Sequence, residues 1–182
     1  MLLQPIQIEL KDGRTATLRS PEQADAAELL AYITKACGET EFLARYPEEW
    51  AGLPVEREEA WVRNLRESPG TLAIACFVDG KLAGNCEINF KPGIKMGHRA
   101  TIAIAILQEY WGLGIGSAMF EEMIAAAQAR GSMIMELEFI EGNHRAQHLY
   151  EKFGFRIVAE KPNAIRLKDG RLLSEFIMQK YL

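Results

Sequence analysis

A glycine-rich stretch in the second half of the chain has the residue types of an anion-binding loop, Tyr110-Trp111-Gly112-Leu113-Gly114-Ile115-Gly116-Ser117. It lies between an apolar β-like run, 100–107, and an amphipathic run rich in Ala and Met, 118–130. Glycine has no Cβ, so such a loop can turn tightly and bring its N–H groups against a ligand. The following helix adds unpaired amides and the positive end of its dipole. The spacing therefore predicts a strand, a turn and a helix that bind a pyrophosphate.

Other interpretations of these glycines remain open. A dinucleotide fingerprint would place a third glycine one position after Gly116, where Ser117 stands. A nucleoside triphosphate loop would end in Gly-Lys-Ser/Thr, and this stretch does not. The glycines are also compatible with a tight strand-to-helix turn that binds nothing.

A second segment with a recognisable pattern follows, Asn143-His144-Arg145-Ala146-Gln147-His148-Leu149-Tyr150-Glu151-Lys152-Phe153-Gly154-Phe155. Asn143 is a typical N-cap, and Gly154 is a typical residue just after a helix C-terminus. Apolar residues recur between them at helical spacing. The segment predicts a short amphipathic helix that carries Tyr150 in its C-terminal half.

Together, the two segments resemble the GNAT superfamily of acetyl-CoA-dependent N-acetyltransferases. The family's second motif, Asn-x-x-Ala-x-x-x-Tyr-x-x-x-Gly-Phe, is matched at every named position from Asn143 to Phe155. In its first motif, Arg/Gln-x-x-Gly-x-Gly/Ala, the two glycine positions are filled by Gly114 and Gly116, but Trp111 stands where Arg or Gln is usual. The resemblance extends from about Thr71 to the C-terminus.

The resemblance implies an α/β (α+β) fold, with a mixed, mostly antiparallel sheet of six to seven strands and about four flanking helices. Two strands would splay apart and hold coenzyme A, and main-chain groups near 104–107 would pair with the pantetheine arm and polarise the thioester carbonyl. Because Trp111 supplies no cation, the phosphates would rest on backbone amides from Gly112 to Ser117. The residues that the resemblance assigns to acetyl-CoA are Ile104, Ile106, Leu107, Trp111, Gly112, Leu113, Gly114, Ile115, Gly116, Ser117, Asn143, Ala146 and Tyr150.

Acetyl transfer to an amine needs a proton donor for the departing thiolate, and Tyr150 fits that task. A phenol has a pKa of about 10, so it is protonated at neutral pH and can donate. An aromatic residue here is also typical of a side chain that fills a gap between helix and sheet. The resemblance favours the general acid, and it places the Asn143 side chain near the pantetheine.

Two residues are candidates for the general base, His98 and Glu87. His98 shares strand parity with Ile104 and Ile106, and an imidazole titrates in the required range. Glu87 lies among apolar residues of the preceding strand, where a carboxylate is costly to bury unless it has a partner or a function. Some family members carry a glutamate nearer the middle of the His98 strand, where this chain has Ala100. Both candidates are also compatible with solvated positions on a strand face, in which case a water chain would take the proton.

The acyl acceptor is expected at the N-terminal helices and the loop from Gly38 to Gly52. That loop mixes carboxylates with aromatics, at Glu39, Glu41, Phe42, Tyr46, Glu48, Glu49 and Trp50. This mixture suits a cationic amine with some apolar body, in a small molecule or a peptide. A solvated surface loop has a similar composition.

The hydrophobic pattern predicts the elements that position these residues. Alternation around Asp12-Gly13 predicts a hairpin or a bent first strand over 6–19. A capping box at Ser20-Pro21-Glu22-Gln23 predicts the start of a helix. Further strands are predicted at 71–78, 81–90, 98–107, 133–140, 156–167 and 172–181, and further helices at 54–66, at 115–130 and after Asn143. A meander precedes the glycine loop, which argues against the parallel βαβ repeats of a Rossmann-type nucleotide binder.

Composition excludes several classes. With 182 residues, 48% of them hydrophobic, the chain can form one N-acetyltransferase domain, in which 1–70 gives the acceptor side and 71–182 the acetyl-CoA-binding core. A net charge of -4 argues against a nucleic-acid partner, and no apolar stretch approaches a membrane span. The histidines and cysteines are scattered, so no metal site is predicted. The cysteines are expected to be reduced, which is typical of a cytoplasmic protein. A homodimer is compatible with the resemblance. The alternative function is a noncatalytic CoA-binding regulator, against which Tyr150 argues.

Overall fold

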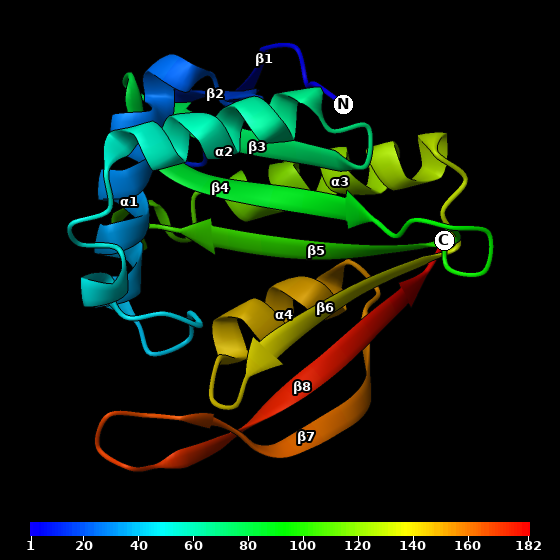
Figure 1. Ribbon diagram of the computed structural model, residues 1–182. Helices are drawn as coiled ribbons and strands as arrows, with labels where there is room; N and C mark the ends of the chain where they lie inside the picture. Colours follow the sequence, from blue (N-terminus) through cyan, green and yellow to red (C-terminus); the bar gives the residue numbers. More distant parts are fainter.

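Eight strands form one mixed sheet in the computed structural model, which describes residues 1–182 (Figure 1). The strand order is β1-β2-β3-β4-β5-β6-β8-β7. The strands are β1 (Ile6–Glu9), β2 (Thr15–Arg19), β3 (Thr71–Val78), β4 (Lys81–Phe90), β5 (Arg99–Ile106), β6 (Ile134–Ile140), β7 (Arg156–Arg166) and β8 (Leu172–Tyr181). The helices are α1 (Ala26–Glu39), α2 (Val55–Glu67), α3 (Ile115–Ala129) and α4 (His144–Lys152), with short 3-10 turns at Gln23–Asp25, Pro47–Glu49 and Gln108–Tyr110.

The predicted fold class is confirmed, with more strands than expected. The segment 6–19 forms two antiparallel strands, not a bent single one, because Gly13 turns the chain at φ +85° and Leu10 accepts a hydrogen bond from the Gly13 amide. This hairpin raises the strand count from six or seven to eight. The predicted bounds of the other strands and of α2, α3 and α4 agree with the structure to within two residues.

One pair of neighbouring strands, β5 and β6, is parallel, and it opens along its length. The two strands are in register from Arg99 opposite Ile134 to Thr101 opposite Glu136, and no partners follow. Figure 1 shows β5 and β6 starting together and diverging. β6 continues by pairing with β8 on its other side, so the sheet stays one body around a wedge-shaped gap.

Helices cover both faces of the sheet, with α1 and α2 on one face and α3 on the other (Figure 1). Strand alternation assigns side chains to these faces. Asn85 and Glu87 of β4 lie on the face of α1, whose Tyr32 hydroxyl oxygen lies 3.1 Å from the Asn85 side chain. Ile106 of β5 lies on the opposite face, against Gly116 of α3.

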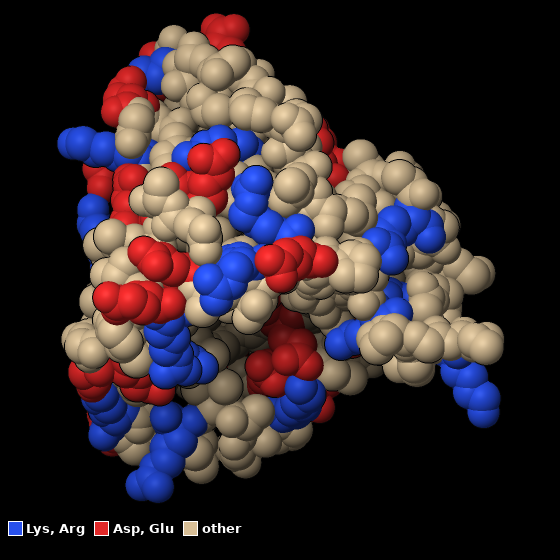
Figure 2. All heavy atoms as spheres, turned by 45° about the horizontal axis from the view of Figure 1, so that its top comes forward, with Lys and Arg blue, Asp and Glu red and all other residues tan.

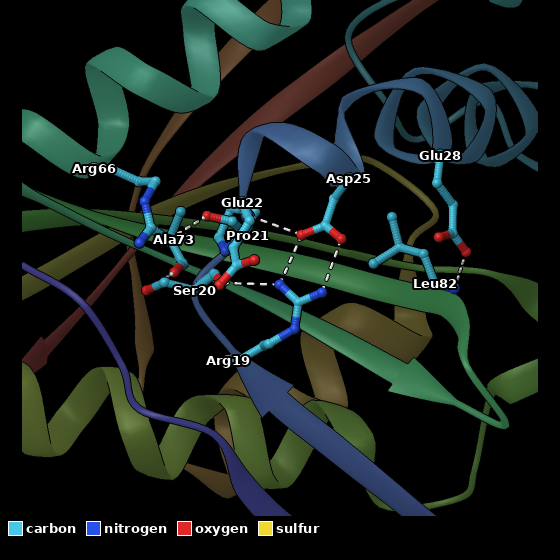
Figure 3. Close-up of polar contacts among 9 residues, drawn as sticks. All are labelled: Arg19, Ser20, Pro21, Glu22, Asp25, Glu28, Arg66, Ala73 and Leu82. Carbon is cyan, nitrogen blue, oxygen red and sulfur yellow. Dashed lines mark hydrogen bonds and ion pairs between the residues drawn. The ribbon is translucent and has the colours of Figure 1, made fainter.

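A polar network ties α1 and α2 to the sheet (Figure 3). Arg19 at the end of β2 donates two hydrogen bonds to the Asp25 carboxylate, at 2.7 and 2.8 Å. Arg66 of α2 donates to the Pro21 carbonyl at 2.8 Å, and Glu28 of α1 accepts from the Leu82 amide at 2.6 Å. The network sets the position of both helices over β3 and β4.

The predicted capping box at Ser20 is wrong in its residues. The Ser20 hydroxyl is buried and donates to the Ala73 carbonyl of β3 at 2.9 Å, so it is not available to the helix. The capping box is formed by Glu22 and Asp25 around the 3-10 turn Gln23–Asp25, where Asp25 accepts from the Glu22 amide at 2.7 Å, and α1 begins after it at Ala26. The competing acceptor on β3 is set by the sheet, which local sequence does not describe.

The three cysteines, Cys37, Cys76 and Cys86, are buried and unpaired, as expected of reduced core residues. None of the helices combines the length and apolar character that crossing a bilayer requires.

Candidate active site

A cavity of about 760 Å³ lies in the gap between β5 and β6 and brings the two sequence motifs together. All the residues assigned to acetyl-CoA line it except Leu107 and Leu113. The α1–α2 loop contributes Phe42 and Leu43, and β6 and β8 contribute Glu138 and Glu175. A space-filling view shows the molecule hollowed on one side, with acidic side chains at the wall of the hollow (Figure 2).

The glycine loop presents a run of free amides to this cavity. Gly112 and Gly114 have φ values of +80° and +102°, a left-handed conformation that suits glycine alone. None of the amide N–H groups from Gly112 to Ser117 donates a hydrogen bond within the chain. α3 begins at Ile115, so the positive end of its dipole adds to these amides. The loop is therefore built to bind an anion.

Gly116 has a second, steric role. A Cβ at this position would lie 3.0 Å from Leu149 Cδ2 and 3.4 Å from Ile106 Cδ1. Glycine thus lets the first turn of α3 approach both α4 and β5. This close approach brings the free amides beside the helix that carries Tyr150.

Trp111 occupies the position where the family motif usually has Arg or Gln, and it does two things there. Its indole Nε1 donates to the Ile106 carbonyl at 2.7 Å, which closes the end of β5 against the loop. Its ring also carries the Arg145 guanidinium, 4.7 Å from the ring centroid. Arg145 therefore brings a positive charge to this position, although Trp111 itself carries none.

Sequence reasoning missed the basic residues around the loop. Arg145 and Lys11 both line the cavity, and Lys152 donates to the Ser117 hydroxyl at 2.9 Å. The signal for Arg145 was its place beside the Asn143 cap. Lys11 had no local signal, since its backbone joins the loop only through the Leu113 carbonyl, which accepts from the Lys11 amide at 3.1 Å.

The edge of β5 that faces the gap has unpaired main-chain groups. The Leu107 amide donates to the Ala83 carbonyl of β4 at 3.0 Å, and its carbonyl accepts from the Tyr110 amide. Because alternate residues of an antiparallel strand pair with the same neighbour, Ile104 directs its N–H and C=O into the gap. Leu107 is buried and both its main-chain groups are used, whereas Ile104 has the open ones, so this geometry favours Ile104 over Leu107 among the residues expected to contact acetyl-CoA.

Leu113 likewise lies outside the cavity lining. Its carbonyl is used by Lys11, and its side chain packs against the core. Only its free amide, in the middle of the loop, is compatible with the predicted role.

Tyr150 lies at the inner wall of the cavity, 6% exposed, among Phe120, Phe139 and Phe155. The Tyr150 hydroxyl makes no hydrogen bond within the chain. It is not fully buried either, so it is exposed to the cavity. Burial raises the pKa of Tyr150 to about 12. The phenol is thus a neutral donor with an unused proton throughout the physiological range.

Asn143 is the N-cap of α4, as its sequence pattern predicts. Its Oδ1 accepts from the Ala146 amide at 3.3 Å, and both residues line the cavity. Gly154, at φ +83°, ends the helix, so the spacing between cap and stop sets the position of Tyr150 within it.

The two candidate bases lie in different places. His98 precedes β5 at the closed end of the gap, where its carbonyl accepts from the Met133 and Ile134 amides, and it lines neither cavity. Glu87 of β4 lies opposite Ala103 of β5 and lines a second hollow beside the gap. Of the two, Glu87 is the one that the fold brings beside Ile104.

The carboxylates of the α1–α2 loop mostly have partners in the chain. Glu41 pairs with Arg171 at 2.9 Å and Glu48 with Lys168, both at the β7–β8 turn. Two more accept from amides, Glu49 from Tyr46 and Glu39 from Gln108. The predicted acidic character of this loop is thus largely neutralised in the fold.

The site fits acetyl-CoA on its own geometry. The diphosphate would be held by the amides of Gly112 to Ser117 with Arg145 and Lys11, and the pantetheine by the open edge at Ile104. A side chain on Gly114 or Gly116 would strain or fill this cradle. No group of three or more His, Cys, Asp or Glu side chains is arranged to hold a metal ion.

A sheet that opens between two parallel strands, with a free-amide loop and a buried phenol in the opening, defines a class of acyltransferases that take the acyl group from coenzyme A. The chain belongs to the acetyltransferase (GNAT) family, whose sequence model matches residues 38–155. The predicted family membership is thereby confirmed, and the acyltransferase class is that of its named relatives.

Two curated relatives are similar over part of the chain. One, from Bacillus subtilis (strain 168), is provisionally named a ribosomal protein bS18-alanine N-acetyltransferase; it is 31% identical over 99 residues, which are 54% of this chain and 63% of that protein. The other, the L-amino acid N-acetyltransferase AaaT of Escherichia coli (strain K12), is 27% identical over 70% of this chain and 79% of its own.

Among solved structures, a GNAT-family acetyltransferase from Streptococcus pneumoniae has a TM-score of 0.84 and 29% identity. The match covers 92% of this chain and 99% of that one. The shared fold therefore extends over most of the chain.

Proposed function

We propose that this protein transfers the acetyl group of acetyl-CoA to a primary amine of a small molecule or peptide by direct attack. The observation that carries the proposal is the meeting, in one cavity, of the free amides from Gly112 to Ser117, the open edge at Ile104 and the unused Tyr150 hydroxyl. Residues 1–182 act as one unit, with 1–70 supplying the acceptor side and 71–182 the acetyl-CoA side.

Acetyl-CoA, when bound, supplies the thioester. The Ile104 amide donates to the thioester oxygen as negative charge develops on it. Tyr150 donates its proton to the thiolate sulfur as the C–S bond breaks. Glu87 accepts the proton that the ammonium group must lose, and its orientation is set by Asn89, whose Nδ2 donates to Glu87 Oε1 at 3.1 Å.

Two kinds of acceptor follow from the names of the relatives. One relative is named for an alanine of ribosomal protein bS18 and the other for L-amino acids. A peptide N-terminus and a free amino acid are therefore both candidates for this chain.

The test is thermal unfolding with acetyl-CoA, CoA, NAD and ATP, followed by thiol release from acetyl-CoA with a panel of amines. We expect selective stabilisation by the two CoA species, since a ligand that binds the native state raises Tm by mass action. Stabilisation by NAD or ATP instead would refute the proposal. Stabilisation by CoA without thiol release from any amine would favour the alternative, a noncatalytic CoA-binding regulator.

A further inference from the structure

A second hollow, of about 380 Å³, lies beneath α1 and α2 on the Glu87 face of the sheet. It shares Leu43, Ala103, Ile104 and Ala105 with the first cavity. It therefore opens beside the edge of β5 where the proposed thioester would lie. An acceptor in this hollow would meet the acetyl group from the α1–α2 side.

One of the residues that line the hollow, Glu87 of β4, carries an oriented carboxylate. A chain of hydrogen bonds runs from the Thr71 hydroxyl to Asn89 Oδ1 at 2.9 Å and from Asn89 Nδ2 to Glu87 at 3.1 Å. Glu87 has no ion-pair partner in the chain. Beside it, Asn85 Oδ1 contacts only the Tyr32 hydroxyl, at 3.1 Å, so this oxygen still has a lone pair that can accept. An ammonium group would be received here.

Two arginines line the same hollow. Arg45, in the α1–α2 loop, stacks on Trp50 with its guanidinium carbon 4.8 Å from the ring centroid. Arg57 lies in the first turns of α2. Both are exposed and neither forms an ion pair, although Glu58, the second carboxylate of the hollow, is adjacent in sequence to Arg57. Two unpaired guanidinium groups at a cavity wall suit a carboxylate ligand.

A large part of the lining is apolar. It is formed by Leu29, Ile33, Leu43, Trp50, Leu53 and Trp61. Two tryptophans and four aliphatic side chains would bury a large apolar group and would leave a small one loosely held.

The carboxylates of the first cavity, by contrast, are already paired. Glu136 pairs with Arg99 at 2.7 Å, and Glu138 and Glu175 both pair with Lys161, at 2.6 and 2.9 Å. The unpaired charges on the acceptor side are thus the two carboxylates and two guanidinium groups of the second hollow. A polycation would find no net negative field there.

From this arrangement we infer that the acceptor is a free α-amino acid with a large apolar side chain, bound in the second hollow. This inference rests on the proposed function. Its ammonium group lies at Glu87 and Asn85, its carboxylate pairs with Arg57 and Arg45, and its side chain packs between Trp50 and Trp61. In the reaction the amine nitrogen bonds to the acetyl carbon, the C–S bond breaks, Glu87 takes a nitrogen proton and Tyr150 protonates the sulfur.

The experiment compares L-phenylalanine, L-phenylalaninamide and phenethylamine as acceptors for the full-length protein with acetyl-CoA, with an Ala-Ala-Ala tripeptide and spermidine alongside. The three aromatic compounds share the amine and the ring and differ at the carboxylate. We expect kcat/KM to be highest for the amino acid and about tenfold or more lower for the amide and the amine, since each loses a charge-assisted contact.

Two variants and one control test whether Arg57 and Arg45 contact the carboxylate of the amino acid. Arg57→Gln and Arg45→Gln should each lower kcat/KM for L-phenylalanine toward the value for its amide, and the loss should be much smaller for phenethylamine. Arg63→Gln is the matched control, because Arg63 is an exposed arginine of the same helix, α2, outside the hollow. It should change none of the three.

Several results would overturn the inference. Equal use of amino acid and amide, equal loss with all three compounds in Arg57→Gln, or preference for the tripeptide or spermidine would each do so while leaving the acetyltransferase proposal intact. Calorimetric binding of the three compounds to the CoA-bound protein gives a second readout. If no compound released thiol and none bound, both the inference and the acceptor panel behind it would fail, whereas CoA-selective stabilisation would still report on the coenzyme site.

Discussion

Two buried tyrosines show how the same side chain is used differently in this fold. The Tyr32 hydroxyl is inserted between β4 and β5, where it accepts from the Asn85 amide at 3.2 Å and donates to the Ala105 carbonyl at 2.7 Å. The Tyr150 hydroxyl makes no such bond and faces the cavity. The Tyr32 phenol therefore stabilises the strand next to the gap, whereas the Tyr150 phenol keeps a proton that it can donate.

At the residue scale, Tyr150→Phe should lower kcat by about a hundredfold with little change in the KM for acetyl-CoA, because it removes the proton donor and keeps the ring. Since the pKa of Tyr150 is raised to about 12, the wild-type kcat should show no loss from phenol ionisation below that pH. Steady-state thiol release over a range of pH measures both. An unchanged kcat would remove Tyr150 from the acid role.

Tyr32→Phe is the matched comparison. It removes hydrogen bonds within the sheet and should lower the free energy of unfolding by about 1–3 kcal/mol, because it leaves buried strand groups unpaired. Tyr150→Phe should leave Tm nearly unchanged, as no hydrogen bond is lost. Thermal unfolding of the two variants separates the structural phenol from the chemical one, and equal destabilisation would contradict the assignment.

At the element scale, the glycine loop works through its backbone conformation. Gly114→Ala should weaken CoA binding by about tenfold and cost about 1 kcal/mol of stability, since Ala at φ +102° is strained. Gly131→Ala is the control: Gly131 ends α3 at φ +69° with open space around it, far along the helix from the loop. It should cost similar stability and leave CoA affinity unchanged. Calorimetry gives both affinities, and the loop's proposed role fails if the two variants bind CoA equally well.

The network of Figure 3 predicts a pH dependence of the helix attachment. Burial raises the pKa of Asp25, but the Arg19 guanidinium and the Glu22 amide outweigh it, and the net pKa is lowered. A carboxyl whose pKa is lowered in the native state stabilises it above the unfolded pKa, and this contribution is lost as pH falls through the native pKa.

Arg19→Gln should therefore destabilise the protein by about 1–3 kcal/mol at pH 7, and the deficit should narrow as the pH falls below about 4. Arg14→Gln is the control, because Arg14 pairs with Asp12 in an exposed turn where an ion pair contributes little. Tm measured from pH 7 to pH 3 checks the prediction. A deficit of constant size across that range would argue against the Asp25 carboxylate as its source.

At the scale of the whole molecule, the α1–α2 loop is fastened to the β7–β8 turn across the open side of the gap (Figure 1). Arg171 pairs with Glu41, and the Lys168 amide donates to the Tyr46 hydroxyl at 2.9 Å. Residues of this loop line both hollows, so the contact couples the C-terminal hairpin to the acceptor side.

The double variant Lys168→Gln, Arg171→Gln should raise the acceptor KM severalfold and change Tm little, because exposed ion pairs stabilise by about 1 kcal/mol or less. Added salt should shift the wild-type KM in the same direction. Arg156→Gln, at an exposed β7 arginine without an ion pair, is the control. Kinetics at two ionic strengths test the coupling, and a KM that matches the control under both conditions would rule it out.

Local sequence determined the elements and much of the coenzyme side. The order of strands and helices, the cap at Asn143, the stop at Gly154 and the turn at Gly112 and Gly114 all follow from short-range rules of periodicity, capping and backbone freedom. These rules act within a few residues, so they can be applied to the sequence without knowledge of the fold. The two motifs were placed on the correct elements for the same reason.

Tertiary structure alone decided which groups remain unpaired. The Leu107 main chain is used by Ala83, the loop carboxylates by the β7–β8 turn, and the Ser20 hydroxyl by β3. The Arg57 side chain, by contrast, forms no ion pair in the hollow that Glu87 also lines. Whether a polar group can meet a ligand depends on what else reaches it first, and those competitors lie far away in sequence. For that reason the proposed coenzyme loop was predictable from residue types, whereas the charge balance of the proposed acceptor side was not.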